Sequence, residues 1–139
     1  MLTEADGGPL AVVVAGANVH DAKLLEETIR AVVVERPDET EVPEQHLCLD
    51  KGYDNPTGRT AASSGGHVPH IRRIGEEKPK RTGKRRRHKP RRWVVERTIG
   101  WLNRCRGILV RYEKKAANYL GVLQLACALL WYRRLHRLA

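Results

Sequence analysis

Residues 75–90, with the sequence GEEKPKRTGKRRRHKP, contain no apolar side chain, and they separate two segments that are rich in them. Gly and Pro interrupt the run, and eight of its sixteen residues are Lys or Arg. Such a segment buries too little surface to offset the chain entropy lost on ordering. We therefore expect a flexible basic arm inside a single domain that spans residues 1–139, a length that suffices for one core.

Charge is unevenly distributed along the chain. Residues 1–69 hold 5 Lys+Arg and 12 Asp+Glu, residues 70–115 hold 18 and 4, and the formal net charge is +10. Concentrated positive charge attracts polyanions. The sequence therefore favours nucleic acid or another anionic surface as the partner, and we expect no small-molecule substrate.

Cysteine usage and apolar runs exclude several other classes of protein. The three cysteines lie far apart without a Cys-x-x-Cys pair, so a zinc site and a disulfide framework are poorly supported. A reducing cytoplasm is the expected setting. The most apolar run, YLGVLQLACALLWY, has 14 residues and includes Gln124, which is too short for a membrane span. We expect no membrane partner.

The first residues predict a hairpin followed by a helix. The tetrapeptide ADGG at residues 5–8 is typical of a hairpin turn. Residues 10–19 would be its second strand, covered on both faces, and only Met1–Glu4 remain for the first. Residues 20–35 are predicted to form a helix with Asp21 in its first turn. Its apolar face would consist of Leu24, Leu25, Thr28, Ile29 and Val32.

Two more strands are predicted before the arm. Residues 46–50 alternate as a short strand that ends in Asp50, and the chain then turns through Gly52 and Asn55–Pro56. A short helix would end near Gly65–Gly66. Residues 67–72 are predicted to form an edge strand because they include Pro69.

Two helices are predicted after the arm. In the first, residues 91–105, the shared apolar face would consist of Trp93 or Val95 with Ile99, Leu102 and Cys105. The second, residues 117–137, is mostly apolar and is expected to be buried. The order of elements predicts an α/β domain in which helices pack on a central sheet.

Two acids are candidates for metal chemistry. Asp50 ends a predicted strand, where α/β folds place their sites, and Glu96 is the only acid in the helix after the arm. Carboxylates from separate elements can hold Mg²⁺ for phosphodiester chemistry. On residue type alone, Asp50 is better explained as a turn former, and Glu96 as an i, i+4 partner of Arg92. The six histidines have no ligand-like spacing.

A resemblance bears on these alternatives. LCLDKGYDN, followed by RRWVVERTIGWLNRCRGILVRYEKKAANYLGVLQLACALL, resembles the C-terminal half of bacterial insertion-sequence transposases. The resemblance is to the group named for insertion sequence five, in the DDE superfamily, and PLAVVVAGANVHDAKLLEETI resembles its middle section. It implies an RNase H-like fold, a mixed sheet with flanking helices, in which three acids hold two divalent ions, Mg²⁺ or Mn²⁺.

The resemblance also implies roles for single residues. Asp50 matches the second acid and Glu96 the third, so both are expected to be catalytic and to bind metal. Arg92 matches the arginine of the related Tyr-Arg-Glu-Lys signature, whereas Lys89 and Asn103 stand at its tyrosine and lysine positions. DNA contacts are expected from Arg81, Lys84, Arg85, Arg86, Arg87, Lys89, Arg91, Arg92, Arg97 and Arg104.

The first acid of the family has no counterpart here, because Asp6, Asp21 and Asp54 lie outside its motif. We therefore expect a chain truncated at the N-terminus or a second-frame product, which lacks the first strand and is inactive alone. The complete enzyme would cut transposon terminal repeats and join the 3′-OH to target DNA. Its partners would be both DNAs and the upstream half or full-length transposase, in the bacterial nucleoid. The alternative is a non-catalytic DNA-binding remnant or regulator of transposition.

Overall fold

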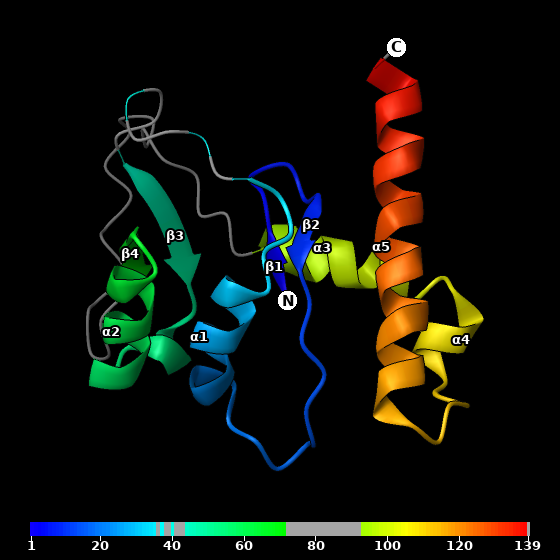
Figure 1. Cartoon of the computed structure of the whole chain (residues 1–139), viewed down its shortest axis with the longest axis horizontal. Coiled ribbons are helices and arrows are strands. Elements are labelled where there is room, and N and C mark those ends of the chain that lie inside the picture. The colour runs from blue at the N-terminus through cyan, green and yellow to red at the C-terminus, as the bar shows by residue number, and fades with distance from the viewer. Residues whose placement is uncertain (36, 38–39, 41–43, 72–92, 139) are drawn as a thin grey trace, which may run out of the picture.

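The structure, a computed structural model, describes residues 1–35, 37, 40, 44–71 and 93–138. The predicted arm therefore lies outside the described residues. The elements, in chain order, are β1 (Leu2–Thr3), β2 (Pro9–Ala11), α1 (Asp21–Arg30), β3 (Gln45–Leu49), the 3-10 turn η1 (Lys51–Tyr53), α2 (Pro56–Ser64), β4 (His67–Ile71), α3 (Trp93–Leu102), α4 (Arg106–Leu109) and α5 (Ala116–Leu138). Figure 1 shows β3, β4, α1 and α2 at one end, the β1–β2 hairpin in the middle and α5 at the other end.

The described strands form two small sheets. β1 and β2 pair antiparallel, and β3 and β4 pair parallel from Gln45↔His67 to Leu49↔Ile71. The mixed α/β class and the hairpin are confirmed, but the single central sheet is wrong for the described residues. The strand predicted over residues 10–19 ends at Ala11, because Val12 and Val14 pack against helix α5 and its neighbours instead of joining a sheet.

The first core joins α1, β3 and α2. Its buried side chains are Leu25, Ile29, Leu47, Ala61 and Ala62. Local signals define both helices that contribute to it. The ring of His20 caps α1 by accepting from the Ala22 amide, and the side chain of Asn55 caps α2 by accepting from the Gly58 amide. α1 ends at Arg30, earlier than the predicted 35, where the β-branched run Val32–Val34 follows.

The turn between β1 and β2, residues Glu4–Gly8, is held by helix α3. The Arg97 guanidinium donates to the carbonyl of Asp6 at 2.5 Å, and the Thr98 hydroxyl lies 2.7 Å from the carbonyl of Gly7. Gly7 has φ +95°, and a Cβ there would lie 2.9 Å from the Thr98 hydroxyl oxygen. Only glycine fits both the backbone and the contact.

Helix α5 holds the same turn from another side. Trp131 donates its indole N–H to the carbonyl of Pro9 at 2.8 Å, and Arg134 pairs with Glu4 at 2.6 Å. A Cβ on Gly8 would lie 2.3 Å from the Trp131 ring, so glycine permits this close approach. Burial alone would raise the pKa of Glu4, but hydrogen bonds from the Gly8 and Asp6 amides and from Arg134 outweigh it and lower that pKa.

The contact with the turn also decides which face of α3 is buried. The buried residues are Val94, Thr98 and Leu102. The predicted face was wrong in part, since Trp93 and Ile99 are exposed and Cys105 lies exposed beyond the helix. The spacing of apolar residues predicted that Ile99, rather than Thr98, would be buried. The hydroxyl of Thr98 is nevertheless fully buried, because it meets the Gly7 carbonyl.

The second core lies between α3, α4 and α5. It consists of Leu102, Ile108, Leu123 and Ala126. α5 covers it with one face only, so the expectation of a buried helix is wrong for the opposite face, where Leu125 and Leu135 are exposed. None of the helices in the described ranges is long and apolar enough to cross a membrane.

The Gly7 contact predicts opposite effects for two glycine substitutions. Gly7→Ala forces a side chain into left-handed backbone and against Thr98, so it should lower the free energy of unfolding by about 1–2 kcal/mol. Gly100→Ala on α3 meets nothing within 4 Å and should raise it by about 0.5–1 kcal/mol. Urea denaturation followed by circular dichroism measures both. An unchanged midpoint for Gly7→Ala would show that the turn is not held as described.

Candidate active site

Asp50 stands where β3 ends. The strand stops at Leu49, and the Asp50 carboxylate caps the turn η1 by accepting from the Lys51 amide at 2.5 Å. Asp50 is exposed and lines a pocket of about 340 Å³ together with Gly52 and Tyr53. Two readings of Asp50, turn former and strand-end acid, are thus both correct in the structure.

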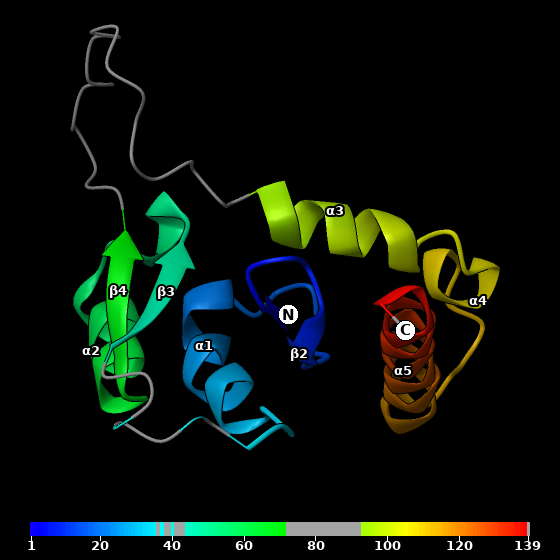
Figure 2. The ribbon, with the colours of Figure 1, turned by 90° about the horizontal axis from the view of Figure 1, so that it is seen from above.

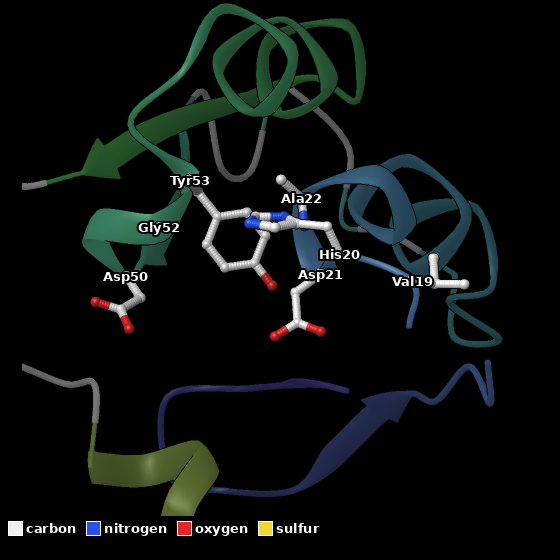
Figure 3. Close-up of a pocket in the computed structure, with 7 residues that line it drawn as sticks. All are labelled: Val19, His20, Asp21, Ala22, Asp50, Gly52 and Tyr53. Carbon is white, nitrogen blue, oxygen red and sulfur yellow. The ribbon is translucent and has the colours of Figure 1, made fainter. Parts of the chain in front are cut away.

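A second carboxylate lines the same pocket. Asp21 is the first residue of α1 and reaches the pocket beside Val19, His20 and Ala22. In Figure 3 the carboxylates of Asp21 and Asp50 point to the same side, with the Tyr53 ring between the segments that carry them. The sequence analysis placed Asp21 outside the motif of the family. Its position at the start of a helix was visible, but the approach of that helix to η1 was not.

The charges around the pocket shift the pKa of Tyr53. Burial raises the pKa of the Tyr53 phenol, and the carboxylates of Asp21 and then Asp50 raise it further. Nearby negative charge disfavours the phenolate. The raised pKa extends to higher pH the range over which the phenol stays a hydrogen-bond donor, next to two acids that are acceptors.

Glu96 is placed by α3 rather than by this pocket. It lies in the first turn of the helix and is exposed, and it does not line the pocket. In Figure 3 helix α3 lies on the side toward which the two aspartates point. Within the described ranges, no three His, Cys, Asp or Glu side chains gather as a metal-binding group. The structure thus brings Asp50 together with Asp21 and leaves Glu96 outside the pocket.

The predicted DNA-binding residues are only partly described. Arg81, Lys84, Arg85, Arg86, Arg87, Lys89, Arg91 and Arg92 lie outside the described residues. Arg97 is half-buried, with its guanidinium 4.5 Å from the ring centre of Trp93 and 4.8 Å from that of Trp101. Arg104 is exposed just after α3. A DNA contact by either arginine stays a prediction, and Arg97 has a structural role besides.

Sequence reasoning also missed one histidine contact. His46 and His70 lie on the adjacent strands β3 and β4. The ring Nδ1 of His46 is 2.8 Å from the ring Nε2 of His70. Both are exposed. Their 24-residue separation gave no local signal, and only the parallel register brings them together.

Comparisons with known proteins give a consistent result. The family model of the transposase DDE domain matches residues 1–131. A protein from Burkholderia cepacia, assigned as the transposase of insertion sequence element IS402, is 33% identical over 146 residues. That match covers 99% of this chain and 63% of the relative, so the chain spans less than two thirds of its length. No solved structure matches.

Removal of the Asp21 charge should be detectable at Tyr53. Asp21→Asn should lower the pKa of the Tyr53 phenol below its value in the unmodified chain, because one of its charged neighbours becomes neutral. Ultraviolet difference titration measures it, with Tyr53→Phe identifying which tyrosine titrates. Asp6→Asn, at an exposed acid in the hairpin turn, is the control and should change nothing. Equal titration curves for Asp21→Asn and the unmodified chain would contradict the pocket geometry.

Proposed function

The chain belongs to the family of transposase DDE domains, and on that premise we propose that it is the C-terminal catalytic part of an insertion-sequence transposase, in the group of insertion sequence five. Family membership itself supports a function in transposition. The proposed reaction of the complete protein is cleavage of DNA at the transposon ends, followed by joining of the 3′-OH to target DNA. The observation that carries the proposal is the position of Asp50, an exposed acid at the carboxyl end of β3 on a pocket wall.

The proposed cofactor is Mg²⁺ or Mn²⁺, held by Asp50 and Glu96 together with the first acid of the family. The donors at the pocket fit a hard cation, because Asp50 and Asp21 present carboxylate oxygens. The ring Nδ1 of His20 accepts a hydrogen bond from the Ala22 amide at the start of α1, so this nitrogen is not offered to a metal. When bound, such an ion would activate a water or a 3′-hydroxyl and stabilise the leaving oxygen. The protein residues orient the carboxylates, and the Lys51 amide fixes one oxygen of Asp50.

An RNase H-like sheet in the complete protein fits the strand edges observed here. β1 pairs only with β2 and β3 only with β4 among the described residues, so each has one edge without a strand partner. Parallel strands normally lie inside larger sheets that are covered on both faces, and open edges favour the addition of a strand. We propose that a further strand, which carries the first acid of the family, lies between β1 and β3.

Basic side chains would position the DNA. The arm at residues 75–90 and Arg92, Arg97 and Arg104 supply positive charge on both sides of Glu96 in the sequence. Contacts of arginine and lysine with phosphates fix the register of a duplex without reading its sequence. The substrates proposed on this basis are the terminal repeats and the target DNA.

The catalytic proposal is tested by cleavage of terminal-repeat DNA in the presence of Mg²⁺. In a protein that includes the region upstream of this chain, Asp50→Asn and Glu96→Gln should each abolish cleavage, because each removes a charged metal ligand. Glu27→Gln, at an exposed acid on α1, is the matched control and should retain activity. The 139-residue chain alone should not cleave. Cleavage by this chain, or by the Asp50→Asn protein, would overturn the proposal.

Binding measurements separate catalysis from the alternative, a DNA-binding regulator. Under both functions, the affinity for duplex DNA should fall steeply with salt concentration, because bound cations are released. Arg86→Gln with Arg87→Gln should reduce the slope of log affinity against log salt by about 1–2 units. The control is Lys23→Gln with Arg30→Gln on α1, which should leave this slope unchanged. A salt-independent affinity would exclude DNA binding through the arm. Binding without cleavage in the longer protein would favour the regulator.

A further inference from the structure

The outward face of α5 carries no charge. Residues 116–132 contain no Asp, Glu, Lys or Arg, although a surface helix normally presents charged residues to solvent. Instead, this face exposes large apolar side chains, with Leu125 71%, Tyr132 61% and Leu135 60% exposed. Large apolar side chains exposed along one helix face are typical of an interaction site. In Figure 2, α5 is seen nearly end-on at the edge of the molecule.

Six of the exposed residues on α5 repeat with alternating spacings of three and four. We call this set the α5 stripe: Asn118, Gly121, Leu125, Ala128, Tyr132 and Leu135, all of which are exposed. This spacing is that of the contact positions in a coiled coil. The residues that face the protein's own core, Leu123, Ala126 and Leu130, lie on the opposite side of the helix. The α5 stripe is thus available to a second helix.

We propose that the α5 stripe is a homodimer interface, in which two copies of this chain pair their α5 helices antiparallel. An antiparallel pair with its two-fold axis midway between Leu125 and Ala128 sets each large residue against a small one. Leu125 faces Ala128 of the second copy, Tyr132 faces Gly121, and Leu135 faces Asn118. Such alternation of large and small residues allows close packing, and the same patch serves both copies, as a two-fold axis requires.

The sequence disfavours other arrangements of the pair. Parallel helices would set Tyr132 against Tyr132 and leave a gap at Gly121, and they would bring Arg133 and Arg134 of both copies to the same end. Antiparallel helices carry these arginines to opposite ends. The α5 stripe carries no charged residue, so a second copy brings no like charge into the contact.

The size of the contact sets its expected strength. The α5 stripe spans 18 residues, from Asn118 to Leu135, which corresponds to about 26 Å of helix. One helix pair buries less than the about 1,600 Å² that is usual for stable interfaces. The dimer should therefore dissociate on dilution.

Sedimentation of the 139-residue chain over a range of concentrations tests the interface. The unmodified chain should convert from monomer to dimer. Leu125→Glu should remain monomeric at concentrations where the unmodified chain is mostly dimer, because it places a charge at the centre of the contact. Leu109→Glu is the matched control, since Leu109 is similarly exposed at 63% but lies on α4. Both variants change solvent-exposed residues, so folding should be preserved, and circular dichroism checks it.

Disulfide trapping tests the register. In a chain with Cys48→Ser, Cys105→Ser and Cys127→Ala, the variants Gly121→Cys and Tyr132→Cys are oxidised separately and as a mixture. In the antiparallel pair, residue 121 of one copy lies eleven residues from residue 121 of the other, and the same holds for residue 132. This is about 16 Å along the axis, which is too far for a disulfide. It sets residue 121 beside residue 132 of the second copy. Only the mixture should therefore yield a crosslinked dimer.

Three results would overturn the proposal. The first is a monomer at every concentration. The second is a dimer that persists in Leu125→Glu or is lost equally in Leu109→Glu, which would place the contact elsewhere, such as at a strand edge. The third is a crosslink in either cysteine variant alone, which is the signature of parallel pairing.

Discussion

The hairpin turn Glu4–Gly8 is the contact on which the rest of the arrangement depends. Two helices that lie about 90 and 130 residues further along the chain bind it, α3 through Arg97 and Thr98 and α5 through Arg134. A turn exposes backbone carbonyls that a sheet does not use, and buried polar groups require partners. These carbonyls are satisfied by side chains of the C-terminal helices. The two ends of the sequence are thus joined through the hairpin turn and through Pro9, the first residue of β2.

Acidic and basic parts of the chain meet in the folded molecule. Glu4 of the acidic first segment pairs with Arg134 near the C-terminus, at a side-chain exposure of about 30% for both. The pocket with Asp21 and Asp50 belongs to the acidic segment, whereas Glu96 follows the basic arm. A site that draws on Asp50 and Glu96 would combine carboxylates for cations with nearby positive charge for phosphates, which are the two requirements of metal-dependent chemistry on DNA.

Local patterns predicted the elements well where local chemistry defines them. The hairpin follows from its ADGG turn, α2 from Asn55–Pro56 and Gly65, and Asp50 from the end of an alternating strand. The failures share a cause, which is contact between distant segments. Thr98 is buried only because Gly7 lies against it, and the run after Ala11 packs on helices instead of a strand. Asp21 lines the same pocket as Asp50 although 29 positions separate them, and no local spacing encodes that proximity.

The bonds from Arg97 and Thr98 to the turn fix how far α3 is rotated about its own axis. Glu96 precedes them directly in the sequence, so its direction is fixed by the same contact. One residue inserted between the acid and the anchor would turn the carboxylate by about 100°. Deletions and insertions in this helix therefore change the direction of Glu96 more than most substitutions do. The position of the hairpin turn and the direction of the acid are therefore linked in the fold, although 88 positions separate Gly8 from Glu96.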